Sequence, residues 1–370
     1  MFNFLKDLNN LFFPEKKEEE EKWQFEYEFK PGENLDMLST SDNDAEVDSM
    51  NIFIKEKNIN INKLKSYNVE QTKKFEYRPT NLNNFIGQAE AKKKAQTIIK
   101  KHNRGMKAHF LVDGIQGHGK TTFVEIIAQE LNAKLISRIG KQIDEDNIVD
   151  ILNEINSSKE HSVMLFIDEF DSMDKKVVKI LNPIIESFTI GNKQIKPFIF
   201  AGATINKHIL IKNNPDTLDR IPIQIKFERY KDNEIKFILK QYKENLYQKE
   251  AVNENIFDVI SQNCKYNPRR AIALMEEYIV EHNIDTVLDN YNIILNGLTK
   301  KDIELLTVLK NSIRPIGAKV LAQKCKLSEA EYITEYEPFL VEYEYINRVP
   351  SRILGEKGKQ FFELKEVSNE

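Results

Sequence analysis

The residues with the clearest chemistry are Gly114–Thr121, which read Gly-Ile-Gln-Gly-His-Gly-Lys-Thr. They match the G-x-x-x-x-G-K-[ST] phosphate loop, in which Lys120 reaches the β- and γ-phosphates and the Thr121 hydroxyl binds Mg²⁺. Glycines let the backbone curl so that N–H groups face phosphate oxygens, and the following helix adds its positive end. An apolar strand predicted at 110–112 and a helix predicted at 122–131 give the motif its required context, so we expect a Mg²⁺-ATP site.

A second element of the site, which ends in acidic residues, follows at 162–171 and reads SVMLFIDEFD. A continuous apolar run of this kind is typical of a parallel strand covered on both faces. Ligands of open α/β sheets lie at the carboxyl ends of the strands. We therefore expect Asp168 to bind Mg²⁺ and Glu169 to polarise the attacking water.

Three further polar residues stand near expected element ends. Thr204 and Asn206 close a buried strand predicted at 197–204, where either can sense the γ-phosphate or cap a helix. Arg269 follows Pro268 at the start of a helix predicted at 271–280. A cation is unfavourable there unless it faces an anion, so Arg269 is a candidate phosphate contact.

The elements that must position these residues predict an α/β fold with a parallel sheet, followed by helices. Helices are expected at 88–101, 146–156 and 175–186, a strand at 134–139, a short hairpin at 188–196 and a strand at 223–227. From 232 to 294 the pattern is helical throughout. Hydrophobic periodicity supports the helices, and Gly191-Asn192 marks the turn of the hairpin.

The last part of the chain predicts a winged helix. Helices are expected at 301–309, 318–324 and 328–343, with Pro338 kinking or restarting the third. Strands at 345–349 and 352–354 complete it. The basic residues at the tip of the wing, either DNA contacts or an ordinary solvated loop, are Arg348, Arg352, Lys357 and Lys359.

Composition bounds the class of protein. The 370 residues are 41% hydrophobic and 30% charged, which is typical of a soluble globular chain. No apolar run of about 18 residues predicts a membrane span, and the first residues do not resemble a secretion signal. The two cysteines, Cys264 and Cys325, form no C-x-x-C pair and give no zinc site. We expect a cytoplasmic location.

The charge is unevenly placed along the chain. Residues 1–74 hold 11 Lys/Arg and 16 Asp/Glu, whereas the rest holds 43 and 42. Any DNA contact must therefore come from local patches. The first 74 residues predict a short helix at 2–12, a strand at 23–29 and a polar linker at 39–49. They can be a poorly ordered tail or a docking arm for a partner protein.

From about Tyr77 to Phe362 the chain resembles the RuvB-type AAA+ motor, which drives Holliday-junction branch migration in bacteria. The motifs that carry the resemblance are RPTNLNNFIGQ (78–88), GIQGHGKTT (114–122), LFIDE (165–169), GAT (202–204), LDR (218–220), NPRRA (267–271) and YEPFLVEYEYINRVPSR (336–352). The last stretch is the most specific. The resemblance implies an AAA+ core at 75–230, an all-α lid at 231–296 and a winged-helix DNA-binding domain at 297–370, after an acidic extension at 1–74.

The resemblance also implies roles for single residues. The adenine pocket would be lined by Tyr77, Arg78, Pro79, Ile86 and Tyr230. The phosphates and Mg²⁺ would be held by Gly117, Gly119, Lys120, Thr121 and Thr122. Thr204 falls in the sensor-1 segment, and Arg269 is the sensor-2 arginine. Arg220, which the residues alone predict to be solvated, would be the arginine finger that completes the ATP site of the neighbouring subunit in a homo-hexamer. Arg348 and Arg352 would contact the DNA backbone.

The chain departs from the family at several positions. Gly114-Ile115-Gln116 replaces Gly-Pro-Pro, and Leu218 replaces an arginine. The hairpin at 188–196, where the family docks a RuvA-like adaptor, is much shorter, which leaves the need for such an adaptor open. The wing turn is one residue shorter, and residues 1–74 replace a short N-terminus. These departures are typical of a divergent relative, such as one encoded by a phage or mobile element.

Two functions follow as hypotheses. The first is a ring-forming, ATP-driven motor on branched or duplex DNA. The alternative is a loader or switch that grips and releases a replication or recombination protein, with residues 1–74 as the docking element. A DNA-binding regulator with a decayed ATPase is disfavoured, because every expected catalytic position is filled.

Overall fold

The computed structural model describes residues 76–190, 192–213, 215–348 and 351–367. The helix, strand and linker predicted within 1–74 lie outside the described residues, as does the predicted turn residue Gly191. No helix in the described part of the chain is long and apolar enough to cross a membrane.

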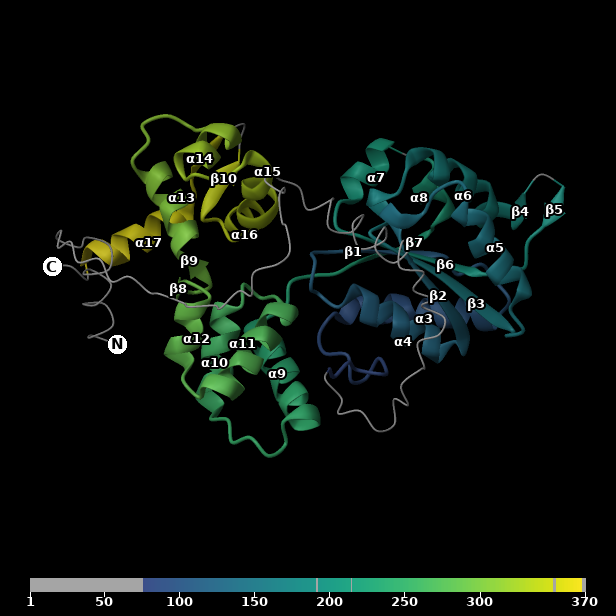
Figure 1. The fold of residues 1–370 in the computed structure, drawn as a ribbon, viewed down its shortest axis with the longest axis horizontal. Helices are drawn as coiled ribbons and strands as arrows, with labels where there is room; N and C mark the ends of the chain where they lie inside the picture. The colour runs from purple at the N-terminus through teal and green to yellow at the C-terminus, as the bar shows by residue number, and fades with distance from the viewer. Residues whose placement is uncertain (1–75, 191, 214, 349–350, 368–370) are drawn as a thin grey trace, which may run out of the picture. The chain divides into compact units, whose positions relative to one another are not determined.

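The centre of the nucleotide-binding part is a five-stranded parallel sheet with the order β2-β3-β6-β1-β7 (Figure 1). Its strands are β1 (Phe110–Asp113), β2 (Ala133–Ile139), β3 (Ser162–Asp168), β6 (Ile199–Thr204) and β7 (Ile223–Lys226). Asp113 pairs in register with Thr204, and β3 lies beside β6. The segments after β1, β3 and β6 therefore leave one edge of the sheet together, which confirms the predicted parallel-sheet fold.

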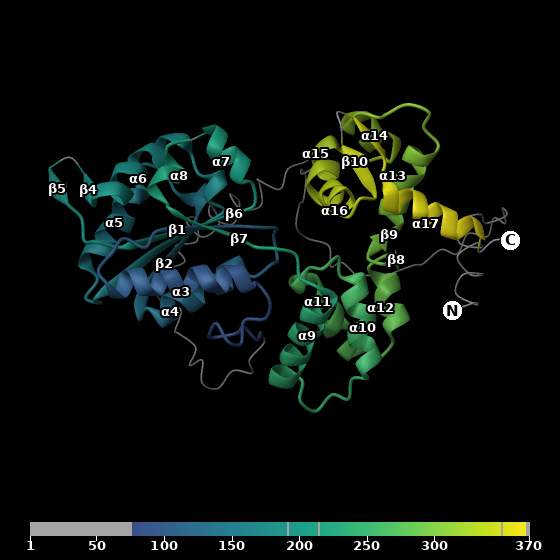
Figure 2. The same cartoon turned by 180° about the vertical axis from the view of Figure 1, so that it is seen from behind.

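Helices cover both faces of this sheet (Figures 1 and 2). One face carries α3 (Ala89–Asn103) and α4 (Lys120–Glu130), and the other carries α5 (Asn147–Ser157) and α6 (Lys175–Ser187). Strand β3 is buried at every residue before Asp168, and its apolar side chains at 163–167 alternate between the two cores. This explains the continuous apolar run in the sequence.

Short elements complete this part of the chain. The predicted hairpin is present as β4 (Thr189–Ile190) and β5 (Lys193–Gln194). After β6 come α7 (Lys207–Asn213) and the four-residue α8 (Thr217–Arg220). Helix α4 begins at Lys120, two residues earlier than predicted, so the lysine and threonine of the phosphate loop lie in its first turn.

The lid contains α9 (Asp232–Leu246), α10 (Glu254–Asn263), α11 (Pro268–Glu281) and α12 (Ile284–Asn290). The prediction of helix through residue 294 was wrong, because β8 (Ile293–Leu295) pairs with β9 (Leu298–Thr299). Asn296 and Gly297 both have positive φ, and Asn-Gly is a strong signal for a tight hairpin turn. The domain boundary predicted between residues 296 and 297 falls inside this turn.

The winged helix is confirmed. Its elements are α13 (Lys300–Lys310), α14 (Ala318–Lys324), α15 (Glu329–Glu331), α16 (Glu337–Glu342), β10 (Ile346–Arg348), β11 (Arg352–Leu354) and α17 (Glu356–Val367). A π-helical turn at Tyr332–Tyr336 precedes α16, and Pro338 lies in the first turn of α16. The predicted third helix therefore restarts at the proline, as expected. Helix α17 was not predicted.

Candidate functional site

The phosphate loop connects β1 to α4, and its backbone requires glycine at three positions. Gly117 and Gly119 have φ of +81° and +87°, in the left-handed region that glycine adopts without a steric penalty. A Cβ on Gly114 would lie 2.7 Å from the Cβ of Phe227. The loop thus curls tightly onto the start of α4, the conformation that directs backbone N–H groups inward.

Lys120 is the buried cation of this loop. Only 7% of the residue is exposed, and its ammonium donates hydrogen bonds to the carbonyls of Gly114 (2.6 Å) and Ile115 (3.0 Å). Burial lowers the pKa of Lys120, and the nearby Asp168 carboxylate opposes that shift. Because a buried ammonium is stabilised by an anionic partner, this position favours a phosphate group.

The predicted metal ligands lie together. The Thr121 hydroxyl donates to Asp168 Oδ2 at 2.8 Å, although the two residues come from α4 and the end of β3. Asp168 Oδ1 also accepts from the Glu169 backbone N–H at 2.9 Å. Glu169 is exposed and adopts a left-handed conformation with φ of +50°, which turns the chain sharply at the sheet edge.

The hydroxyl of Thr204, at the end of β6, both donates and accepts a hydrogen bond. It donates to Asp171 Oδ1 at 2.6 Å and accepts from the Asn206 backbone N–H at 3.1 Å. The residue is 1% exposed. Asp171 therefore fixes the orientation of this hydroxyl, while Asn206 stands exposed just before α7.

A cavity of about 560 Å³ joins these groups to the predicted base pocket. The residues predicted for the site that line it are Tyr77, Arg78, Pro79, Ile86, Gly117, Gly119, Lys120, Thr121, Thr122, Asp168, Glu169, Thr204, Tyr230 and Arg269. Arg78 is held by Glu76 (2.9 Å) and Glu125 (3.4 Å). The geometry brings the proposed adenine end and the phosphate end into one cavity.

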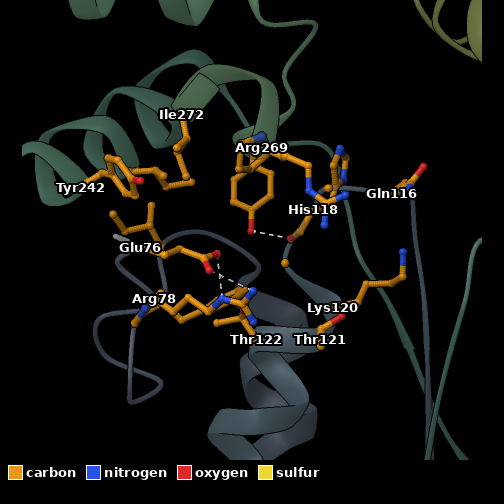
Figure 3. A pocket seen from close by; sticks show the side chains of 18 of the residues that line it. Glu76, Arg78, Gln116, His118, Lys120, Thr121, Thr122, Tyr242, Arg269 and Ile272 are labelled. Atoms are coloured by element: carbon orange, nitrogen blue, oxygen red, sulfur yellow. Dashed lines mark hydrogen bonds and ion pairs between the residues drawn. The ribbon is translucent and has the colours of Figure 1, made fainter. Parts of the chain in front are cut away.

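The lid closes one side of this cavity. Arg269 and Ile272 from α11 and Tyr242 from α9 lie opposite Lys120 and Thr121 (Figure 3). The pattern at 267–271 is thus a helix start whose first arginine, Arg269, faces the phosphate loop. A cation at a helix N-terminus is unfavourable alone, so Arg269 is placed for an anionic ligand.

Several contacts that support the phosphate loop were not predicted. Asn267 donates to the Gln116 carbonyl at 2.8 Å, and the Tyr230 hydroxyl donates to the His118 carbonyl at 3.0 Å. Burial lowers the pKa of His118 to about 4, so its ring is neutral near neutral pH. The position of Asn267 before Pro268 signals a helix cap, which it is, but nothing in the sequence signals its bond to the phosphate loop.

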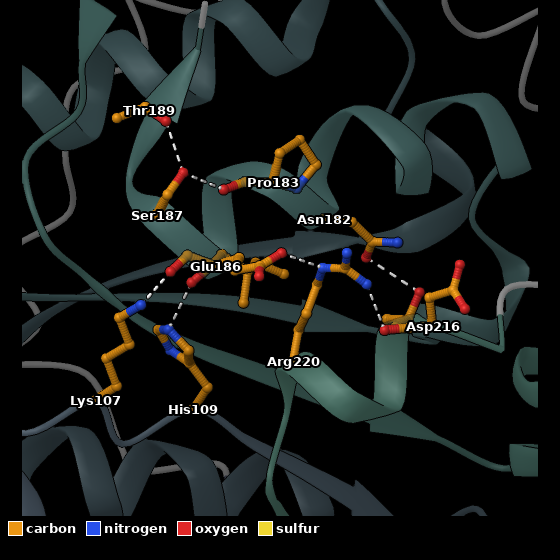
Figure 4. A network of polar contacts seen from close by, with 11 residues as sticks. Lys107, His109, Asn182, Pro183, Glu186, Ser187, Thr189, Asp216 and Arg220 are labelled. Atoms are coloured by element: carbon orange, nitrogen blue, oxygen red, sulfur yellow. Dashed lines mark hydrogen bonds and ion pairs between the residues drawn. The ribbon is translucent and has the colours of Figure 1, made fainter.

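Arg220 lies apart from the other predicted residues. Its Nε contacts Glu186 Oε2 at 2.8 Å and its Nη1 donates to the Asp216 carbonyl at 2.7 Å (Figure 4). It lines a second cavity of about 470 Å³ with Lys107 and His109, among others. Within the described residues, Arg220 does not line the cavity of the phosphate loop.

The two predicted DNA-binding arginines differ in environment. The Arg348 side chain is 58% exposed on the wing. Arg352 is 8% exposed and its guanidinium bonds both carboxylate oxygens of Glu337, at 2.5 and 3.1 Å. Glu337 also accepts from the Tyr332 hydroxyl at 3.1 Å. This burial argues against the DNA contact predicted for Arg352, since its charge is already neutralised inside the winged helix.

We expect Arg352→Ala to destabilise the protein rather than to weaken DNA binding alone. Removing one partner of a buried ion pair typically costs about 3–5 kcal/mol, because the other charge stays buried. Thermal unfolding should therefore shift downward for Arg352→Ala and stay near the wild-type value for Arg348→Ala. The matched Arg348→Ala variant should instead bind DNA more weakly. Equal melting temperatures of wild type and Arg352→Ala would contradict this structural role.

Comparison with known proteins agrees with this geometry. The model of the Holliday junction DNA helicase RuvB P-loop domain matches residues 77–213, and that of the RuvB C-terminal winged helix domain matches residues 295–363. Holliday junction branch migration complex subunit RuvB of Mycoplasma genitalium is 29% identical over 310 residues, which cover 78% of this chain and 98% of the relative. The subunit of Campylobacter jejuni subsp. doylei is 29% identical over 334 residues, covering 81% and 96%.

Solved structures give the same result. The Thermotoga maritima RuvB Holliday junction branch migration motor superimposes with a TM-score of 0.66 at 27% identity, covering 77% of this chain and 98% of that one. Both family domains thus occur on one chain in the expected order. They contain the phosphate loop and the winged helix that the sequence predicts. The chain belongs to the RuvB-type ATPases.

Proposed function

We propose that this chain is a Mg²⁺-ATP-driven DNA motor that forms a ring and drives branch migration or translocation on branched or duplex DNA in recombination and repair. The observation that carries the proposal is the single cavity in which Lys120, the Thr121–Asp168 pair and Arg269 meet. The same chain carries a winged helix with an exposed arginine on its wing. The relatives named above are branch migration subunits, which supports this substrate.

The residues present fit Mg²⁺-ATP. The Thr121 hydroxyl and the Asp168 carboxylate, 2.8 Å apart, are the hard oxygen ligands that Mg²⁺ prefers. The described residues contain no group of three or more His, Cys, Asp or Glu placed to hold a metal alone. This donor set suits Mg²⁺, which commonly takes one or two side chains plus substrate phosphates and water. When bound, the ion would neutralise charge on the β- and γ-phosphates.

The chain's own residues would divide the work. Lys120 would exchange the carbonyls of Gly114 and Ile115 for phosphate oxygens. Arg269 would bind the phosphates from the lid side. Glu169, exposed at the carboxyl end of β3, would orient and polarise the attacking water. Thr204, oriented by Asp171, would sense the γ-phosphate.

The proposal is tested by the ATPase rate with and without a synthetic four-way junction, in the absence of any partner protein. We expect measurable basal hydrolysis and a higher rate with the junction, because the winged helix that would bind DNA and the ATP site belong to the same chain. Binding of DNA without any ATP hydrolysis, with or without the junction, would contradict a motor.

The alternative function, a loader or switch for a replication or recombination protein, is favoured by one observation. The hairpin β4–β5 has only two residues in each strand, which reduces the surface where the family docks its adaptor. A strand-separation assay on a four-way junction distinguishes the two functions. A motor separates the arms when ATP is added, whereas a loader hydrolyses ATP and leaves them intact. The need for an adaptor, the number of subunits and a cytoplasmic location remain predictions.

A further inference from the structure

Two short segments at the base of the lid each contact two different parts of the chain. One is Arg229–Tyr230, between β7 and α9, and the other is Tyr266–Asn267, between α10 and α11. In each segment one residue contacts the winged helix and its neighbour contacts the phosphate loop. The two segments thus converge on the phosphate loop at one end and on Tyr343 of the winged helix at the other.

On the side of the phosphate loop, both contacts are hydrogen bonds to backbone carbonyls. The Tyr230 hydroxyl donates to the carbonyl of His118 at 3.0 Å, and Asn267 Nδ2 donates to that of Gln116 at 2.8 Å. A Cβ on Gly117, between these two carbonyls, would lie 2.5 Å from Asn267 Oδ1. Tyr230 and Asn267 therefore hold the phosphate loop by two backbone carbonyls, one on each side of Gly117.

On the side of the winged helix, both contacts reach Tyr343, just after α16. The Arg229 guanidinium lies 3.8 Å from the centre of the Tyr343 ring, and its Nε contacts Glu342 Oε1 at 2.6 Å. The Tyr266 ring stacks on the same Tyr343 ring, with centroids 4.8 Å apart and planes 6° from parallel. A cation over the ring face and a second ring stacked on it both interact favourably with the aromatic π system, so the two segments share one anchor in Tyr343.

A buried ion pair makes this side rigid. Lys265 Nζ contacts Asp302 of α13 at 2.7 Å, with side chains that are 12% and 0% exposed. Lys265 and Tyr266 both have φ of +52°, a left-handed conformation that costs free energy for residues other than glycine. Two successive residues keep this conformation only when surrounding contacts hold them, so the segment is a stiff connection.

We propose that Arg229–Tyr230 and Tyr266–Asn267 form a coupling joint between the phosphate loop and the winged helix. Nucleoside triphosphate changes the position of the loop carbonyls that Tyr230 and Asn267 hold. Arg229 and Tyr266 pass this displacement to Tyr343 and so to the DNA-binding domain. Because coupling between two binding sites is reciprocal, DNA changes nucleotide affinity by the same factor. The inference rests on the proposed nucleotide and DNA sites and assigns the residues that connect them.

The test measures affinity for a non-hydrolysable ATP analogue with Mg²⁺, in the presence and absence of a four-way junction. Coupling factors are typically about 5–150-fold, and we expect a factor in this range for the full chain. In Arg229→Ala the factor should fall to about one, while each ligand alone still binds as in wild type. Hydrogen exchange of residues 337–348 should respond to the analogue in wild type and not in this variant.

Two further variants separate coupling from folding. Tyr343→Phe keeps the ring that Arg229 and Tyr266 contact and should keep the factor, whereas Tyr343→Leu should lose it. Arg104→Ala removes an equally charged, exposed side chain at the end of α3 and should have no effect. Retention of the wild-type factor in Arg229→Ala would overturn the joint. Wild-type chain that binds both ligands independently would also overturn it, whereas failure to bind the analogue at all would overturn the proposed function as well.

Discussion

Glu169→Gln is expected to bind ATP with near wild-type affinity and to hydrolyse it about 10²–10⁴-fold more slowly. Glu169 is exposed at the carboxyl end of β3 and follows Asp168, which is bonded to Thr121. An amide of the same shape cannot polarise water as a carboxylate does, yet it preserves the fold and the metal ligands. The measurements are phosphate release at saturating ATP and a binding titration with a fluorescent ATP analogue.

The matched control is Glu130→Gln at the end of α4, which removes the same charge from an exposed position of the same part of the chain. It should hydrolyse ATP like wild type. Turnover of Glu169→Gln at the wild-type rate would remove Glu169 from the proposed mechanism. Loss of ATP binding in Glu169→Gln would instead indicate a structural role at the left-handed turn after β3.

The core of the fold follows from short-range patterns, which is why the sequence predicted it well. Parallel strands buried on both faces must be apolar throughout, and 162–168 is such a run. Thr121 and Asp168 lie 47 positions apart, yet they were expected to meet because each follows the carboxyl end of a strand. Such an expectation needs only the strand order of a parallel sheet.

Other features depend on how distant segments pack, and no periodicity encodes them. The bond from Asn267 to Gln116 spans 151 positions and requires the lid to lie against the phosphate loop. Arg352 was placed among the basic residues at the tip of the wing, either as a DNA contact or in a solvated loop. Its strand instead turns it inward onto Glu337, an acid whose own position on α16 depends on the restart at Pro338. Charge alone does not determine which face of a short strand is buried.

The missed hairpin β8–β9 has a different cause. Its signal, Asn296-Gly297, is present in the sequence and is a strong indicator of a tight turn. The helical pattern before it was extended four residues beyond Asn290, the last residue of α12, across Ile293 and Ile294. Helix α17 was missed because Gly358 lowers helix propensity in its first turn. The structure requires a glycine there, since a Cβ at this position would lie 2.5 Å from the Tyr345 carbonyl oxygen.

Arg220→Ala is expected to reduce hydrolysis by about 10³–10⁵-fold if Arg220 completes the site of a neighbouring subunit. In its own subunit the guanidinium contacts Glu186 and the Asp216 carbonyl and lines a cavity that is distinct from that of the phosphate loop. Its side chain is 28% exposed. An arginine in this position can reach a triphosphate only on another copy of the chain, so its effect must depend on assembly.

Mixing two inactive variants tests this directly. Lys120→Ala lacks a functional phosphate loop but retains Arg220, and Arg220→Ala has the reverse defect. When the two are combined, an Arg220→Ala subunit beside a Lys120→Ala subunit forms one complete site, so ATPase activity should reappear. Arg138→Ala, which breaks a comparable surface pair with Glu154 (2.6 Å), should be active alone and serves as the matched control. An arginine that acts across an interface must be replaceable by the same arginine of a neighbouring subunit. Two outcomes would therefore assign Arg220 to the second cavity alone. One is full activity of pure Arg220→Ala, and the other is a mixture that stays inactive although the subunits associate.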